Sequence, residues 1–309
     1  MFFLAGVAVA LRLYTRGIIL RVLGWEDWCI CLALVFSGGN TIGMCLQATT
    51  ALGRHIWTLT KEEMSFFLKE VYFTILVYNL GLAFVKLSIL LLYIRLFAAV
   101  YLQRTIYIVL GTVAIVSTWA IGSSAFFCIP VAAFWDPQVT GTCLRKEPRW
   151  YAGAALNIFT DIIILALPLF IFRSLRMHMR QKIGLYFVFA LGFFVCIVSM
   201  LRFSSLVVAA KTTDPTGDNP GVAKWSTIEI NTAIICACLV TLKPLISRFF
   251  PKLLGSDHPG GDDGRHGNTD VRSPPPTVGG GSNWRLRRTS VSNYPTLVGT
   301  SSTDGTLHD

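Results

Sequence analysis

Four ionisable side chains stand inside long apolar stretches of this sequence, where a charge can bind a ligand or relay an ion. They are Lys86, Asp161, Arg202 and Glu229, and Asn157 adds an amide close to Asp161. A charged group in the middle of a membrane-spanning helix costs roughly 3 kcal/mol, so such residues usually face a partner or a water-filled site. These five residues are the first candidates for a functional site.

Asp161 and Asn157 lie four residues apart, so a helix places both on one face. Asp161 is close to the middle of its apolar run, and its short side chain cannot reach water from there. We expect the pair to face the interior of the molecule in one of two roles. The first is a polar contact between helices, and the second is a site for a ligand or an ion.

The other ionisable residues lie nearer the ends of their runs. Lys86 approaches the cytosolic end of its run, where it either extends its ammonium to the surface or acts with Arg95 in cytosolic signalling. Arg202 falls late in one run and Glu229 early in the next. This placement predicts that they pair near the outer surface, or line an outward-facing pocket beside Trp225.

The elements that carry these residues are predicted to be membrane helices. The chain is 53% hydrophobic and 14% charged, whereas about a quarter of the residues in a soluble domain are charged. About 20 apolar residues cross a bilayer as a helix, and six runs qualify: 28–51, 71–94, 106–133, 151–172, 184–209 and 228–248. We therefore expect lipid to surround this chain.

A seventh run at the start of the sequence is shorter. Met1–Leu11 offers about half a span before Arg12, unless Arg12 and Arg16 extend toward water. We expect this first helix to be incomplete, with its beginning missing from the sequence. The predicted fold class is all-α: a seven-helix transmembrane bundle over residues 1–250, followed by a disordered tail over residues 251–309 that is rich in Gly, Pro, Ser and Thr.

Basic residues in the short loops predict the orientation. Twelve lie in the loops and helix ends assigned to one side and eight on the other, and the more basic side is normally cytosolic. We expect the N-terminus outside and the tail in the cytosol, with the plasma membrane as the location. The net charge of +10 does not indicate nucleic-acid binding, because the basic residues lie between apolar runs and in the tail rather than on one soluble face.

Two of the eight cysteines differ from the rest. Cys128 and Cys143 fall near the outer end of one helix and in the loop after it, on the oxidising side, which predicts a disulfide between them. The other six lie inside apolar runs as small buried residues. Members of the closely spaced pairs point to nearly opposite faces of a helix, and every histidine falls in a loop or the tail, so we expect no metal, no cofactor and no enzymatic activity.

The tail carries one candidate for modification. Ser290 follows three arginines in the segment Trp284–Ser290, and a hydroxyl after basic residues is the arrangement that basophilic kinases recognise. The same segment is equally suited to lie on anionic lipid.

The sequence resembles the fungal rhodopsin-domain family of integral membrane proteins, some of which are described as receptor-like. The resemblance rests on these segments in this order: Arg12–Arg16, Gly24–Trp28, Gly53–His55, Lys86–Arg95, Cys128–Pro130 with Trp135 and Cys143, Asn157 with Asp161 and Pro168, Arg202, and Trp225–Glu229. It implies a seven-helix membrane protein with a disulfide at the Cys128 and Cys143 positions. No agreed biochemical activity comes with it.

Two functional classes fit these expectations. The first is a receptor for an unknown ligand that signals through cytosolic loops and tail to a heterotrimeric G protein or another cytosolic partner, although the sequence lacks Asp-Arg-Tyr after the third helix and Asn-Pro-x-x-Tyr in the seventh. Retinal is not expected, because no lysine lies in the middle of the last helix. The alternative is a transporter or channel that uses Asp161 and Asn157 inside the membrane.

Overall fold

The computed structural model describes residues 1–51, 53, 57, 59–96, 100–136, 138–173, 179–211 and 220–241. The chain divides into two units, Met1–Asp257 and His258–Asp309, and all described elements belong to the first. The predicted disordered tail and Ser290 lie outside the described residues. In chain order the elements are α1 Phe2–Tyr14, the π-helix η1 Thr15–Ile19, α2 Trp25–Thr50, α3 Lys61–Leu96, α4 Val100–Ala125, β1 Cys128–Ile129, the 3-10 helix η3 Val131–Phe134, β2 Thr142–Cys143, α5 Lys146–Arg173, α6 Met179–Lys211 and α8 Pro220–Thr241.

Seven helices among the described residues are long and apolar enough to cross a membrane, which confirms the predicted all-α fold class. One predicted run extends further than its helix. The run 106–133 was expected to be helical throughout, but α4 ends at Ala125. The chain then turns into β1, η3 begins after Pro130, and proline lacks the N–H that would continue a helical hydrogen-bond ladder.

Local sequence signals fix where several helices begin. At the start of α3, the Thr60 amide donates to Glu63 Oε2 at 2.8 Å and the Glu63 amide donates to Thr60 Oγ1 at 3.3 Å. This reciprocal pair satisfies amides that the first turn leaves free. At the start of α2, the Gly24 amide donates to Asp27 Oδ2 at 3.1 Å. Pro220 opens α8, a position where its fixed φ suits a helix and no N–H is needed.

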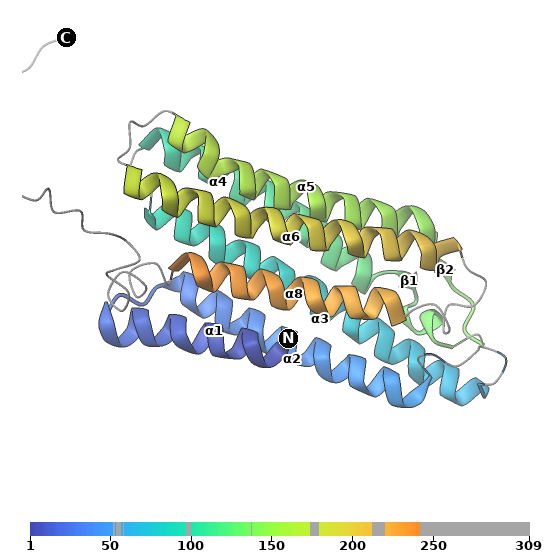
Figure 1. The fold of residues 1–309 in the computed structure, drawn as a ribbon. Coiled ribbons are helices and arrows are strands. Elements are labelled where there is room, and N and C mark those ends of the chain that lie inside the picture. The colour runs from blue at the N-terminus through green and yellow to red at the C-terminus, as the bar shows by residue number, and fades with distance from the viewer. Residues whose placement is uncertain are drawn as a thin grey trace, which may run out of the picture. The chain divides into compact units, whose positions relative to one another are not determined.

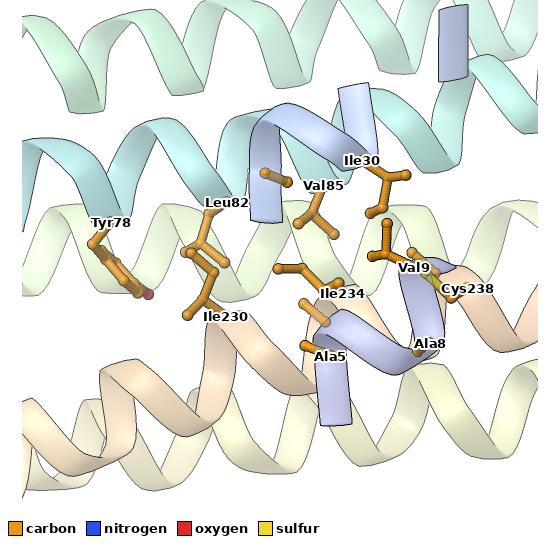
Figure 2. Packing of buried hydrophobic residues seen from close by; sticks show 13 residues of the cluster. Ala5, Ala8, Val9, Ile30, Tyr78, Leu82, Val85, Ile230, Ile234 and Cys238 are labelled. Atoms are coloured by element: carbon orange, nitrogen blue, oxygen red, sulfur yellow. The ribbon is translucent and has the colours of Figure 1, made fainter. Parts of the chain in front are cut away.

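Neighbouring helices pack in a closed order, α1, α2, α3, α4, α5, α6 and α8, and α8 packs back against α1 (Figure 1). Two further pairs of helices are in contact, because α8 also packs against α2 and α3. The largest buried apolar cluster surrounds α8 and combines side chains of α1, α2, α3 and α8, including Ala5, Ile30, Tyr78 and Ile234 (Figure 2). A second cluster, around Leu90 and Ile106, joins α3, α4 and α5.

Two glycines allow close approach between helices. A Cβ on Gly81 of α3 would lie 2.4 Å from Cδ1 of Ile230 on α8, and a Cβ on Gly43 of α2 would lie 2.5 Å from Oγ1 of Thr74 on α3. Small residues bring membrane helices close enough for their backbones and polar side chains to interact. Both contacts involve α3, which therefore packs tightly against α2 and α8.

The half-span prediction assumed that the first helix ends at Arg12, and this assumption is wrong. Helical structure continues through η1, so Phe2–Ile19 forms an 18-residue candidate span. Arg12 and Arg16 are 0% and 6% exposed, so neither extends toward water. Their charges are neutralised by carboxylates of α2, described below, which is why the helix continues past them.

Cys128 and Cys143 form a disulfide, as predicted. They are paired residues of the two-stranded antiparallel sheet, in which β1 meets β2 with Cys128 opposite Cys143. The bond ties the segment between α4 and α5 to one end of the helices (Figure 1). We call this end the disulfide end.

Candidate functional site

Lys86 of α3 is the centre of a buried polar cluster. Its Nζ lies 3.1 Å from Asp161 Oδ1 and donates to Asn157 Oδ1 at 2.8 Å and to Thr160 Oγ1 at 2.6 Å. The residue is 7% exposed. The prediction that Lys86 reaches toward the cytosolic surface is wrong, because a carboxylate and three oxygen acceptors on α5 hold its ammonium among the helices.

Asp161 and Asn157 share one face of α5, as predicted, and both meet residues of other helices. Asn157 Nδ2 lies 3.5 Å from Asp161 Oδ2 and donates to Glu229 Oε1 at 2.9 Å. The Ser199 hydroxyl of α6 is 3.1 Å from Asp161 Oδ2 and 2.8 Å from Glu229 Oε1. A hydroxyl has one proton, so Ser199 donates to one of these carboxylates at a time.

Arg202 and Glu229 pair, as predicted, with Arg202 Nε 3.4 Å from Glu229 Oε2. The same nitrogen donates to Ser226 Oγ at 3.1 Å, and the guanidinium carbon lies 4.3 Å from the centre of the Tyr78 ring. The Tyr78 hydroxyl donates to Glu229 Oε2 at 2.5 Å. Glu229 is 1% exposed, so the pair is buried among the helices, and Arg202 also lines the larger of the two cavities described below.

These contacts bring four of the five candidate ligand-binding residues into one group, together with Lys86. We name it the central cluster: Tyr78, Lys86, Asn157, Thr160, Asp161, Ser199, Arg202, Ser226 and Glu229. Trp225, the fifth candidate, is half-buried on α8 and lines neither cavity described below. The cluster holds two cations and two carboxylates, so its charges balance, as buried charges require.

Two cavities lie on either side of this cluster. The large cavity, about 170 Å³, extends toward the disulfide end and is lined by α2, α3, α4, α5, α6 and α8. The small cavity, about 80 Å³, extends the other way among α3, α5, α6 and α8. Leu82 and Lys86 line both. The central cluster therefore separates the large cavity from the small one.

A second buried cluster lies where α1 ends and α2 begins. Arg12 Nε is 2.9 Å from Asp27 Oδ1, Arg16 Nη2 is 2.5 Å from Glu26 Oε1, and Arg95 Nη1 of α3 is 2.8 Å from the same Glu26 oxygen. Arg12 Nη1 also donates to the Ala237 carbonyl of α8 at 3.0 Å. We name these residues the end cluster: Arg12, Arg16, Glu26, Asp27 and Arg95.

Sequence reasoning missed the end cluster by treating its arginines as topology signals. A signal was present, because Arg12 and Arg16 lie four residues apart on one helical face and Glu26 and Asp27 follow shortly after. Arg95 is near the predicted cytosolic end and its side chain is 41% exposed. Tyr78 and Ser199 of the central cluster were also missed, since nothing in the sequence says which hydroxyls face a carboxylate.

The described residues include no group of three or more His, Cys, Asp or Glu side chains that would hold a metal ion. The polar chemistry of the site is therefore carried by ion pairs, hydroxyls and amides. Its contacts join α3, α5, α6 and α8 to one another.

Seven apolar helices with charged residues paired between them define a multi-pass integral membrane protein. Residues 11–248 match the model of the fungal rhodopsin domain. The chain belongs to this family, as the resemblance implied. No solved structure is significantly similar to it.

Several curated fungal proteins are similar to the chain. The "SAT4 family membrane protein" of Emericella nidulans is 29% identical over 240 residues, which cover 76% of this chain and 57% of that protein. The "Polyenoic acids biosynthesis gene cluster protein Ba17b" of Metarhizium anisopliae is 30% identical over 81% of this chain and 72% of its own length. "Receptor GIN3" of Arthrobotrys oligospora is 24% identical over 82% of this chain and 62% of its own length.

Proposed function

We propose that this membrane protein is a receptor whose ligand occupies the large cavity and whose response is read at the opposite end of the helices. The observation that carries the proposal is the cavity itself, because six helices line it and residues of the central cluster form part of its lining. A ligand there contacts Lys86, Asn157 and Arg202 directly. The relative named "Receptor GIN3" supports the same class. The proposal involves no cofactor and no enzymatic activity.

The disulfide supports an orientation in which the large cavity opens outside the cell. Disulfides form in oxidising compartments and are rare in the cytosol, and Cys128–Cys143 lies at the cavity end. The loop charges point the same way, with the more basic loops opposite. We therefore place the N-terminus outside and the C-terminus in the cytosol, in the plasma membrane.

α3 is the element that would carry the response. It supplies Lys86 to the central cluster and Arg95 to the end cluster, nine residues or about 13 Å apart along the helix. A ligand that binds one arrangement of the Lys86 partners more tightly shifts the population toward that arrangement. Because α3 is one continuous helix, the shift moves Arg95 relative to Glu26 at the cytosolic surface, where a heterotrimeric G protein or another partner binds.

One observation favours the alternative, a transporter or channel. The two cavities lie on opposite sides of the central cluster, and Lys86 lines both. In a carrier, Asp161 and Asn157 would form the site that is reached from each side in turn. The receptor is preferred because the buried ion pairs close the path between the cavities in this structure.

Gly153 provides the test, because it lines the large cavity and an added Cβ there meets nothing within 4 Å. Gly153→Phe should therefore place its ring in the cavity and occupy the space of a ligand. Gly111→Phe is the matched control, since Gly111 also has open space but does not line the cavity. A library of small carboxylates, alcohols and amines is applied to cells that report dissociation of a fluorescently tagged heterotrimeric G protein.

We expect at least one compound to act through wild type and Gly111→Phe, and to lose roughly tenfold or more in potency with Gly153→Phe. Purified protein in lipid vesicles is tested for uptake of the same compounds. One outcome would replace the receptor proposal by the carrier proposal. In that outcome wild type takes up a compound, Asp161→Asn abolishes the uptake, and no compound produces a G-protein response.

A further inference from the structure

The two cavities differ in the sign of their charged walls. The large cavity is lined by Lys86, Arg149 and Arg202, and the described residues that line it include no Asp or Glu. The carboxylates of the central cluster, Asp161 and Glu229, line the small cavity instead. The ion pairs therefore span the boundary, and their cationic members face the larger space. A cavity with this wall attracts anions and repels cations.

Arg149 contributes the strongest part of that wall. Lys86 and Arg202 each have a carboxylate within 3.4 Å, but Arg149 has none within 4.0 Å in the described part of the chain. Its Nε donates to the Ser123 carbonyl at 3.1 Å, Nη2 donates to Ser124 Oγ, and its guanidinium lies over the Phe127 ring. All these partners are neutral. The oxygens in the last turns of α4 fix the guanidinium and offset part of its charge, but no carboxylate of the described residues pairs with it.

The bonds to α4 leave donors of Arg149 for a ligand. A guanidinium has five N–H groups, and the two on Nη1 of Arg149 donate to none of the described residues, so they remain for the oxygens of a carboxylate. Three recorded bonds run from its Nε and Nη2 to the last turns of α4. Arg149 is thus positioned by the protein before any ligand arrives, which lowers the entropy cost of binding.

The cavity also sets the size of its occupant. Arg149, Gly153 and Asn157 are spaced by four along one face of α5, so the lining runs about 12 Å from the first to the last. The volume of about 170 Å³ is close to that of cavities that hold a single benzene. Trp119 and Trp150 supply apolar wall, and Asn157 supplies hydrogen bonds at the deep end.

We propose that the large cavity binds a compact organic carboxylate, with the carboxylate on Arg149 and one aromatic ring or a short alkyl chain in the space beyond it. This inference rests on the proposed function of the cavity as a ligand site, and adds the chemical class of the ligand. A monoanion fits better than a phosphate monoester, because a second charge would have to be desolvated against a largely apolar wall.

The test uses 3-phenylpropanoate, its neutral amide and the corresponding amine, 3-phenylpropylamine, with the full chain purified in lipid nanodiscs. Titration calorimetry should show that the acid binds at least roughly tenfold more tightly than the amide, as expected for a charge-assisted pair, and that the amine binds weakest. Arg149→Gln should remove the preference for the acid and Arg149→Lys should retain part of it. Arg145→Gln, which removes an exposed charge four residues earlier and outside the cavity lining, should behave as wild type.

The outcomes separate this inference from the receptor proposal. Equal or tighter binding of the amide or the amine would overturn the anion preference and leave a ligand cavity in place. Acid binding that Gly153→Phe does not weaken would lie outside the cavity and would also overturn the inference. If Arg149→Gln does not unfold cooperatively, the variant is not properly folded and the inference is judged from wild type alone. Equal affinities of wild type for the acid and the amide would then overturn the inference.

Discussion

Each charged residue of the central cluster has an opposite charge close by, and this pairing explains how four ionisable groups exist among apolar helices. Lys86 lies 3.1 Å from Asp161, and Arg202 lies 3.4 Å from Glu229. Removing one member of a buried pair leaves the other without compensation, whereas replacing both with apolar residues is often tolerated. The two pairs also share Asn157 and Ser199 as hydrogen-bond partners. A change in one pair therefore alters the hydrogen bonds of the other.

Asp161→Leu should destabilise the protein by about 3 kcal/mol, because it strands the Lys86 ammonium. The loss is at the low end of the usual range, since Asn157 and Thr160 still accept hydrogen bonds from Lys86. Lys86→Met should cost a similar amount, and the double variant Lys86→Met/Asp161→Leu should recover most of it. Unfolding in an SDS titration measures these values, and additive losses in the double variant would show that the two residues do not act as a pair.

Sequence alone identified Asp161, Asn157, Arg202 and Glu229 as candidates and placed Asp161 and Asn157 in the interior, because the cost of a charge in lipid depends on its position in an apolar run. It also paired Arg202 with Glu229. It did not pair Lys86 with Asp161, since that contact depends on how α3 and α5 are rotated about their axes. Helix rotation is set by packing details such as the close approach of Gly81 to Ile230, which no local pattern reveals.

At the scale of elements, the charges near α1 and α2 determine how the first helix is held. Arg12 and Arg16 would end an apolar helix in lipid, yet α1 continues into η1 because Glu26 and Asp27 neutralise them. The end cluster also joins α3 through Arg95 and α8 through the Ala237 carbonyl. Hydrophobicity predicted most of the spans, but it made the first helix too short. The neutralisation that allows α1 to continue joins residues of different helices, so it does not appear in the hydrophobicity of one run.

Glu26→Gln should loosen the attachment of α1 and α3 to the start of α2, because Arg16 and Arg95 both lose a charge partner. We expect a loss of about 2 kcal/mol, less than for a buried charge that loses its only partner, because Arg16 keeps Asp27 Oδ2 at 3.3 Å and the Arg95 side chain is 41% exposed. Glu62→Gln is the matched control, since Glu62 is an exposed carboxylate in the first turn of α3, where the effect should stay below about 1 kcal/mol. Thermal unfolding in nanodiscs compares the two, and equal midpoints would contradict the role assigned to Glu26.

At the scale of the whole described bundle, the disulfide, the large cavity, the central cluster and the end cluster follow one another along the helices. α3 contributes to the cavity and to both clusters. If the large cavity binds a ligand, as proposed, this order places the ligand toward one end of α3 and the charged residues of the end cluster toward the other, which is the separation of two sites that the receptor proposal requires. The cysteines of the sequence predicted the disulfide at one end of the helices. A cavity is a property of side chains from six helices and could not be predicted from any one of them.

The most direct test of this account is thiol labelling of the cavity in intact cells. Gly153→Cys and Gly111→Cys are made in a Cys45→Ser background, because Cys45 is an exposed free cysteine, and are treated from outside with membrane-impermeant methanethiosulfonates carrying a sulfonate or a trimethylammonium group. We predict that only Gly153→Cys is labelled, and that the anionic reagent reacts faster because Lys86, Arg149 and Arg202 line the cavity. A Gly153→Cys thiol that reacts only after the cells are permeabilised, or not at all, would contradict a cavity open to the outside.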